Sequence, residues 1–272
     1  MEDKKTVAIN CDMAEEDGPL SEHSKALFPL LYSCNISCGA HAGDALQIQQ
    51  TIAAAIAHRV QIGAHPSYPD RIGFGRRDIN ISNSALKASL FYQLYALKGM
   101  VEYQAARISY VKAHGALYHA INNNKHVAEL FAEIVLSIDE NMSLMGCSGS
   151  VLEQAAVSKG GQFIAEAFLD RRYNNSGGLV QRGQEKAVIS QADEVLEQVL
   201  DLVVKHQVQS LNGYLLPIKA TSFCVHGDHS NTLDILRYLQ KELPAFGIQL
   251  ANSHKHRIDL DQCHILMETL DS

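Results

Sequence analysis

The stretch "VQIGAHPSYPD", from Val60 to Asp70, runs from an apolar segment typical of a β-strand directly into a histidine followed by two prolines. The chain repeats this pattern of a histidine directly after a short apolar run and close to a glycine. The further copies are "SCGAHAGD" (Ser37 to Asp44), "YVKAHGALY" (Tyr110 to Tyr118) and "FCVHGD" (Phe223 to Asp228). One histidine at a strand end means little, but four at equivalent positions favour a functional role over a structural one.

Short apolar runs alternate along the whole chain with segments of helical periodicity. The predicted strands are Thr6–Asn10, Leu31–Ser37, Val60–Ala64, Ser109–Lys112, Ser143–Gly146, Phe163–Ala167 and Ser222–Val225. The predicted helices are one that a capping box of Asp44 and Gln47 opens, three with apolar faces over residues 86–101, 127–138 and 195–203, and one after Asn231. This alternation is typical of a parallel α/β protein.

Strands of this kind form either a closed barrel or an open doubly wound sheet. No G-x-G-x-x-G motif follows the first strand and no G-x-x-x-x-G-K-[ST] motif occurs, so neither a dinucleotide site nor a P-loop for ATP is predicted. Polar residues follow nearly every strand, which suits a barrel whose active site is built from many loops at one end. We therefore expect a TIM-like (β/α) barrel and, because no linker of Pro, Gly and Ser divides the chain, a single domain over residues 1–272.

The composition excludes several classes of protein. The 272 residues are 46% apolar, which is enough for a sizeable core. The net charge of −7, without blocks of like charge, gives no basis for binding nucleic acid or a membrane surface. The chain lacks an apolar run long enough to span a membrane and the apolar region of a secretory signal. Its six cysteines fit the buried, reduced thiols of a cytoplasmic protein better than a disulfide scaffold.

Residues just past the ends of parallel strands lie at one end of the sheet, so these distant segments are expected to converge. They bring together histidines, carboxylates and cations, which are the groups of general acid–base catalysis and of metal binding. The converging residues are Asp12, Glu15, His41, Asp44, His65, Asp70, Lys112, His114, Glu166, Asp170, Arg171, Arg172, His226 and Asp228. Asp44 and Asp228 also have a structural explanation, because aspartate commonly begins a helix.

Two arginine pairs follow predicted strands. Arg76 and Arg77 lie in "PDRIGFGRRD", which is a long loop for its position, and Arg171 and Arg172 lie in "EAFLDRRY". A solvated surface turn would explain the first pair. Guanidinium groups also bind carboxylates and phosphates in a bidentate manner, so two such pairs favour an anionic ligand.

Six ordered motifs, spread over most of the chain, resemble those of the LamB/YcsF family. They are "INCDMAE" (Ile9 to Glu15), "NISCGAHAGD" (Asn35 to Asp44), "IGAHPSYPDRIGFGRRD" (Ile62 to Asp78), "VKAHGALY" (Val111 to Tyr118), "EAFLDRRY" (Glu166 to Tyr173) with "GGLVQRG", and "CVHGD" (Cys224 to Asp228). The family usually has glycine at Ala14, phenylalanine at Ala40 and proline at Ala113. None of these departures removes an acid, a base or a charged group, so they concern the shape of the pocket.

The resemblance implies an irregular (β/α) barrel similar to the glycoside hydrolase/deacetylase superfamily. It also implies a hydrolase, a 5-oxoprolinase, that opens the lactam of 5-oxo-L-proline to L-glutamate with ATP, together with partner subunits B and C. Opening an unstrained lactam requires coupling to ATP, and a partner that binds ATP would explain why this chain has no recognisable site for it.

On this interpretation the catalytic candidates are Asp12, His41, His65, His114, Glu166 and His226, with Asp12 as the general base. The substrate-binding candidates are Glu15, Asp44, Arg76, Arg77, Lys112, Arg171, Arg172 and Asp228. A divalent metal would be bound by Asp12, His41 and His65.

Two other functions compete with this hypothesis. One is a metal-dependent deacetylase of an N-acetylated carbohydrate, because similar barrels bind a metal with an aspartate and two histidines. The other is a non-catalytic component that only binds the ligand. The sequence leaves open whether a metal is bound, which residue is the base, and whether copies of the chain form a homo-oligomer.

Overall fold

Seven parallel strands close into a barrel in the order β10-β2-β3-β4-β5-β6-β7. The structure is a computed structural model that describes residues 5–227 and 231–251. The barrel strands are β2 (Ile9–Met13), β3 (Ser33–Ser37), β4 (Gln61–His65), β5 (Ile108–Lys112), β6 (Ser143–Cys147), β7 (Phe163–Phe168) and β10 (Ser222–His226). Each overlaps a predicted strand. The prediction of an irregular TIM-like barrel is therefore confirmed, with seven strands where the regular fold has eight.

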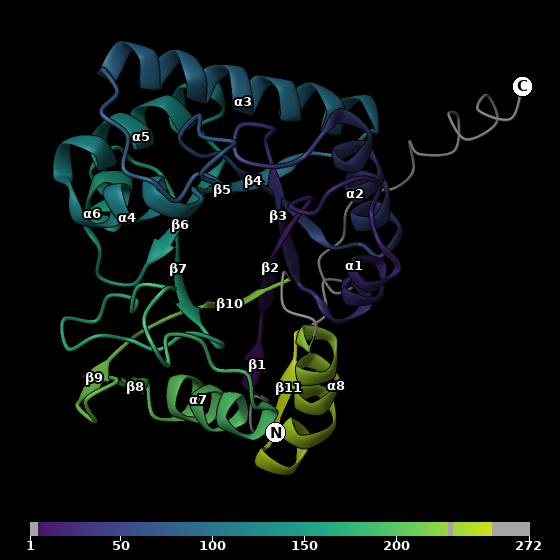
Figure 1. The fold of residues 1–272 in the computed structure, drawn as a ribbon, viewed down its shortest axis with the longest axis vertical. Coiled ribbons are helices and arrows are strands. Elements are labelled where there is room, and N and C mark those ends of the chain that lie inside the picture. The colour runs from purple at the N-terminus through teal and green to yellow at the C-terminus, as the bar shows by residue number, and fades with distance from the viewer. Residues whose placement is uncertain (1–4, 228–230, 252–272) are drawn as a thin grey trace, which may run out of the picture.

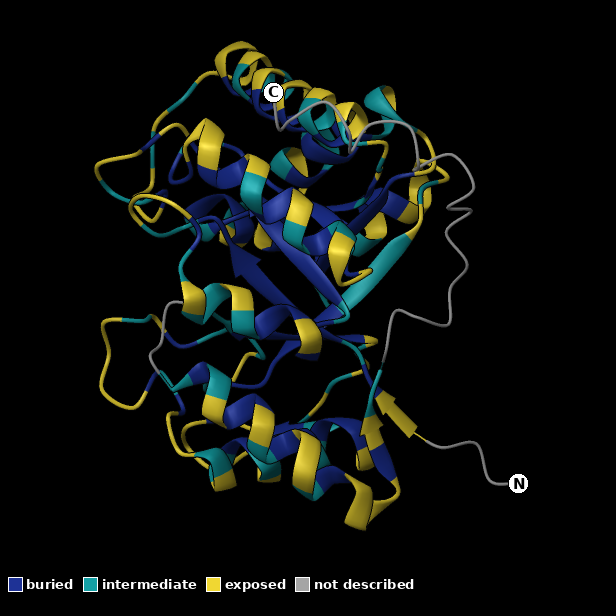
Figure 2. Ribbon diagram, turned by 90° about the vertical axis from the view of Figure 1, so that its right-hand side faces the viewer, coloured by how far each residue is buried: buried dark blue, intermediate teal, exposed yellow. Residues whose placement is uncertain are grey.

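Helices surround the barrel and present their apolar faces to it (Figures 1 and 2). The α-helices of the described segments are α1 (Glu22–Leu27), α2 (Ala45–Ala57), α3 (Asn83–Tyr103), α4 (Gly115–Asn123), α5 (Lys125–Ile138), α6 (Val151–Ser158), α7 (Ala192–Val204) and α8 (Thr232–Glu242). The five predicted helices are present as α2, α3, α5, α7 and α8. The short helices α1, α4 and α6 were not predicted, because helices of so few turns show little periodicity.

The predicted first strand, Thr6–Asn10, is wrong in its bounds. The chain forms two strands here, β1 (Lys5–Val7) and β2. Strand β1 pairs in parallel with β11 (Ile248–Leu250) outside the barrel, whereas β2 enters the barrel beside β3 and β10. Asp12 therefore lies within a barrel strand and not in the loop that follows.

A two-stranded antiparallel ribbon of β8 (Gln207–Gln209) and β9 (Leu215–Pro217) lies between α7 and β10 in the chain. Two 3₁₀ helices complete the described elements: η1 (Phe28–Leu30) after α1 and η2 (Leu243–Phe246) after α8. Within residues 5–227 and 231–251, no helix has the length and apolarity that a membrane span requires.

The predicted capping box at the start of α2 is half formed. The Asp44 side chain accepts a hydrogen bond from the backbone N–H of Gln47 at 2.9 Å, as an N-cap does. The Gln47 side chain does not return this bond to Asp44. It donates instead to the carbonyls of Glu16 and Gly18, at 2.9 and 2.7 Å. Helix α2 thereby anchors the loop that follows Glu15.

The interior of the barrel is polar, because alternate residues of several strands that point inwards are asparagine, aspartate, lysine or tyrosine. The Asn10 amide donates to Ser222 Oγ at 2.8 Å, and the Asn35 amide donates to Asn10 Oδ1 at 2.8 Å. The Tyr110 hydroxyl donates to Asn35 Oδ1 at 2.6 Å. A Cβ atom on Gly63 would collide with the Tyr110 ring, so glycine makes room for it. Each of these buried polar groups thus has a partner from another strand.

Candidate active site

A cavity of about 810 Å³ opens at the carboxyl ends of the barrel strands. Among the predicted site residues, Asp12, His65, Lys112, His114 and His226 line it, and so do Arg76 and Arg171. They come from β2, β4, β5, β10 and the loops after β4, β5 and β7. The volume lies in the range of small-molecule sites, and the lining supplies acids, bases and cations together.

Asp12 has neighbours on both of its carboxylate oxygens. Its Oδ1 atom accepts hydrogen bonds from Asn35 Nδ2 at 2.7 Å and Lys112 Nζ at 3.1 Å. Its Oδ2 atom lies 3.3 Å from His65 Nε2. Burial alone would raise the pKa of Asp12, but the charges of His65 and Lys112 outweigh it and hold this pKa well below its usual value. Asp12 is therefore an ionised carboxylate at neutral pH.

Lys112, from the end of β5, connects the two sides of the barrel interior. Its buried ammonium lies 2.8 Å from Glu166 Oε1 and also contacts Asn10 Oδ1 and Cys224 Sγ, at 3.2 and 3.1 Å. Burial opposes the charge of Lys112, but Asp12, Cys224 and Glu166 raise its pKa well above the usual value. Lys112 is thus a fixed cation between two carboxylates.

His226 at the end of β10 is the register partner of Asp12 on the adjacent strand β2. Its Nδ1 atom lies 2.9 Å from Asp170 Oδ2, and its backbone N–H donates to the same oxygen at 2.8 Å. The Phe168 ring stacks on the imidazole, with ring centroids 5.8 Å apart. Asp170 therefore fixes the orientation and the tautomer of His226, in the way that a carboxylate orients a catalytic histidine.

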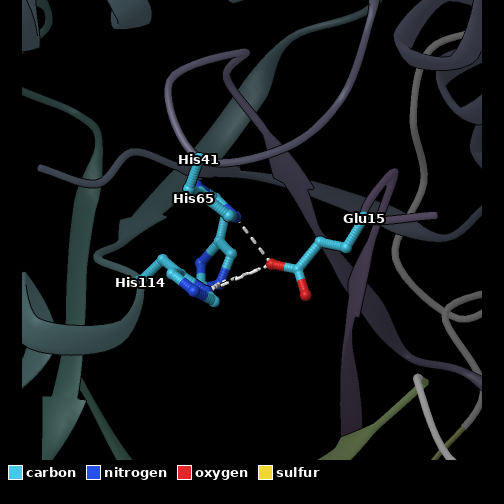
Figure 3. A group of neighbouring side chains, drawn as sticks. All are labelled: Glu15, His41, His65 and His114. Carbon is cyan, nitrogen blue, oxygen red and sulfur yellow. Dashed lines mark hydrogen bonds and ion pairs between the residues drawn. The ribbon is translucent and has the colours of Figure 1, made fainter. Parts of the chain in front are cut away.

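Three histidines converge on one oxygen of Glu15 (Figure 3). Glu15 Oε1 lies 2.8 Å from His41 Nε2, 3.1 Å from His114 Nδ1 and 3.6 Å from His65 Nε2. Burial would raise the pKa of Glu15, but the charge of His114 and hydrogen bonds from His114 and His41 hold it well below its usual value. Burial lowers the pKa of His41 to about 4, so His41 is neutral at physiological pH.

The loop after β4 covers these histidines. The Phe74 ring packs edge-on against His41 and His114, with ring centroids 5.4 and 5.2 Å away. Gly75 has a φ of 64°, and a Cβ on it would lie 3.0 Å from both His114 Cδ2 and His41 Cβ. The next residue, Arg76, places its guanidinium carbon 4.9 Å from the centre of the Phe74 ring. The glycine therefore lets the loop approach the imidazoles closely.

The predicted arginine pairs do not act as pairs, because neighbouring residues point in different directions. Arg76 lines the cavity, whereas Arg77 forms a bidentate ion pair with Asp70 within the loop. Arg171 lines the cavity while its guanidinium donates to the Val180 carbonyl at 2.6 Å. Arg172 pairs with Glu194 of α7. The structure thus places one member of each pair at the cavity.

Other predicted residues stand apart from the cavity lining. Glu166 contacts the site through Lys112 and accepts a hydrogen bond from the Tyr118 hydroxyl at 2.8 Å. Asp44 is the N-cap of α2 and does not line the cavity. Asp228 lies outside the described residues.

The metal candidates are also grouped differently from the prediction. His41 and His65 lie with Glu15 and His114, whereas Asp12 lies with Cys224 and His226. Donor atoms within each group lie within 4.8 Å of one another.

Sequence reasoning missed Tyr118 and Arg182, which line the cavity, and Asn35, which holds Asp12. Tyr118 and Arg182 lie inside the quoted motifs, so their positions were visible, but nothing in the pattern showed that they turn towards the cavity. Asn35 carried a signal that was not used. It is a polar residue in the middle of a predicted buried strand, where an unpaired amide would be costly.

A parallel barrel with acid–base groups in a cavity at the carboxyl ends of its strands is the arrangement of TIM-barrel enzymes, and fold and site define the protein as one of this class. The LamB/YcsF family matches residues 7–257, and the chain belongs to this family.

Relatives and a solved structure agree with this assignment. The A subunit of 5-oxoprolinase from Haemophilus influenzae (strain PittEE) is 42% identical over 246 residues, covering 90% of this chain and 99% of the relative. The protein of the same name from Geobacillus thermodenitrificans is 37% identical over 251 residues, covering 92% and 98%. The crystal structure of the lactam utilization protein from Thermus thermophilus superposes with a TM-score of 0.82 at 30% identity, covering 91% of this chain and 99% of that one. The resemblance seen in the sequence motifs is therefore confirmed.

Proposed function

We propose that the protein is the hydrolytic component of an ATP-dependent 5-oxoprolinase, which opens the lactam of 5-oxo-L-proline to L-glutamate. Relatives aligned over nine-tenths of the chain are named as the A subunit of 5-oxoprolinase, and a similar solved structure is a lactam utilization protein. That name supports the presence of partners, which we assign as subunits B and C. Because the sequence contains no P-loop, we assign ATP binding to a partner.

The observation that carries the proposal is that Asp12 and His226 lie side by side on adjacent strands and line one cavity. Lactam opening needs a base that takes a proton from the attacking water and an acid that protonates the departing ring nitrogen. Asp12 is ionised and suits the first role. His226, oriented by Asp170, suits the second, since its Nε2 atom is left for the substrate when Nδ1 faces Asp170.

The same cavity supports an anionic substrate. Arg76, Arg171 and Arg182 line it on the side of the loops, and Lys112 lies at its base. 5-Oxoproline carries one carboxylate, for which a guanidinium is the best-matched partner in proteins. Arg171 is already bonded to a backbone carbonyl, so we assign carboxylate recognition first to Arg76.

The proposal is tested by assaying 5-oxoproline consumption and ATP hydrolysis with the purified partner proteins. Asp12→Asn keeps the size of the side chain but removes its basicity, and we expect turnover to fall by roughly 10²–10⁴-fold. Asp17→Asn, at an exposed position of the following loop, is the matched control and should retain full turnover.

Each alternative function predicts a different outcome of this assay. Full activity of the Asp12→Asn complex together with retained ligand binding would support a non-catalytic binding role. Release of acetate from an N-acetylated sugar, without ATP or partners, would instead support a deacetylase.

A further inference from the structure

We propose that Glu15, His41, His65 and His114 form a binding site for one divalent transition-metal ion, of the borderline class that includes zinc. The inference goes beyond the proposed function and holds whichever amide the cavity hydrolyses. It stands on the positions of four donor atoms, on the hydrogen bonds that fix two of the imidazole rings, and on the enclosure of the cluster.

The four donor atoms are spaced as ligands of one small cation would be. Glu15 Oε1 lies 2.8, 3.1 and 3.6 Å from His41 Nε2, His114 Nδ1 and His65 Nε2, and the last two nitrogens are 3.1 Å apart. Tetrahedral ligands at about 2.0–2.1 Å from zinc are separated from each other by roughly 3.4 Å. The observed separations scatter around this value, so a cation at the centre requires only small shifts of the side chains.

Backbone carbonyls fix the rings of two histidines so that lone pairs face the centre of the cluster. His65 donates Nδ1–H to the Lys112 carbonyl at 2.7 Å, and His114 donates Nε2–H to the Phe74 carbonyl at 2.9 Å. In the neutral rings, His65 Nε2 and His114 Nδ1 then carry lone pairs that point at each other and at the Glu15 carboxylate. Metal-ligating histidines are typically oriented by this kind of hydrogen bond from the other ring nitrogen.

Lone pairs that converge in this way require a proton or a metal ion between them. Protonation would make imidazolium ions within a buried cluster of three histidines, where burial and mutual repulsion oppose the charge. His41 follows this rule, because burial and the neighbouring His114 lower its pKa to about 4. A metal ion satisfies all four donors at once and leaves the imidazoles neutral.

The donor set selects the class of metal. Three imidazole nitrogens and one carboxylate oxygen, without a thiolate, suit zinc, manganese, iron, cobalt or nickel, and do not suit magnesium or calcium, which prefer oxygen ligands. The four side chains are buried or nearly so, and Phe74 packs over two of the rings. His65 and His114 also line the cavity, so the site is reached from the side where substrate would bind.

The second group of donors, Asp12, Cys224 and His226, is a poorer metal site. Lys112 Nζ lies 3.1 Å from both Asp12 Oδ1 and Cys224 Sγ, so an ammonium already stands where a cation would bind. Burial raises the pKa of Cys224 well above its usual value, which keeps the thiol protonated and a poor ligand. The positively charged group therefore differs between the two clusters: lysine in one, and a metal ion in the other.

The test measures metal binding directly, with the tag-free chain and without partners or substrate. Chelator-treated protein is titrated with Zn²⁺ and Co²⁺, and metal content after gel filtration is determined by mass spectrometry. We expect one equivalent per chain, visible absorption bands of Co²⁺ with nitrogen ligands, and a rise of the melting temperature Tm on addition of Zn²⁺.

Two variants and a matched control locate the site. Glu15→Gln and His114→Ala, each checked for folding by circular dichroism, should lose tight binding and the Tm rise. His119→Ala lines the same cavity outside the cluster and should retain both. Wild type that holds no metal and shows no Tm shift with any of the five metals would overturn the proposal, as would unchanged binding in both cluster variants. A failure of lactam opening would not affect it.

Discussion

Replacing Lys112 by methionine should destabilise the protein more than almost any other single change of a charged residue. The side chain is 2% exposed, and its ammonium lies 2.8 Å from Glu166 Oε1 and 3.1 Å from Asp12 Oδ1. Methionine fills a similar volume, so the effect on packing is small. It leaves two buried carboxylates without the cation between them.

Removal of one partner from a buried ion pair typically costs about 3–5 kcal/mol, because the other charge remains desolvated. For a chain of this size 1 kcal/mol corresponds to roughly 2–4 °C in Tm, so we expect Tm to fall by about 6–20 °C. The pKa of Lys112 is raised above 10.5, so the stabilisation is fully present below that pH and is lost only as pH rises through the folded-state value. The loss should therefore be constant between about pH 6 and pH 9.

Urea unfolding followed by circular dichroism measures the effect. Lys125→Met is the matched control, since the Lys125 side chain is 81% exposed and its ion pair with Glu129 spans 3.8 Å; it should change stability by less than about 0.5 kcal/mol. The double variant Lys112→Met/Glu166→Gln should recover part of the loss, because it removes one of the stranded charges. A loss below about 1 kcal/mol for Lys112→Met would refute the reasoning, since it would mean that water reaches the carboxylates.

Two further predictions concern the loop after β4. Arg76→Ala should raise KM for the anionic substrate by roughly 10–150-fold, the equivalent of losing a charge-assisted contact of about 1.5–3 kcal/mol, whereas Arg77→Ala should lower Tm and leave KM unchanged; equal effects of both on KM would contradict the assignment. The ion pair with Arg77 lowers the pKa of Asp70 from 3.8 to about 2, so its stabilisation is present above pH 3.8 and is lost as pH falls through about 2. The Tm difference between wild type and Asp70→Asn should therefore stay constant from about pH 7 to pH 4 and narrow below; a difference that disappears between about pH 7 and pH 5 would rule this out.

The fold was largely predictable, because each barrel strand leaves a local signal of apolar run and polar end. The first strand shows where local signals fail. Residues Thr6 and Val7 look like the start of a barrel strand but pair with β11 near the other end of the described chain, and no local pattern reveals that partner. Asn10 and Asp12 look like loop residues, yet they are strand residues whose polar groups are satisfied by side chains inside the barrel.

The candidate site was predictable as a set of residues but not as a set of contacts. Parallel topology alone brings Asp12, His65 and His226 to one end of the barrel. Whether Glu15 joins the histidines, or Asp12 joins Lys112, depends on the directions of side chains over short distances, which sequence spacing does not fix. The arginine pairs make the same point, since two adjacent residues of identical type point to different surroundings.

The insertion of β10 between β7 and β2 makes the last-made strand the keystone of the ring. Asn10 and its partner Ser222 are 212 residues apart, so at translation rates of about 5–20 residues per second the first barrel strand waits roughly 10–40 s for its neighbour. During that interval β2 and β7 both present unpaired edges, which are templates for wrong pairing. A transcript truncated before Ser222 would therefore yield a chain that is catalytically incomplete and also prone to aggregate, with the hydrogen-bonding edges of an unclosed sheet open to any neighbouring strand.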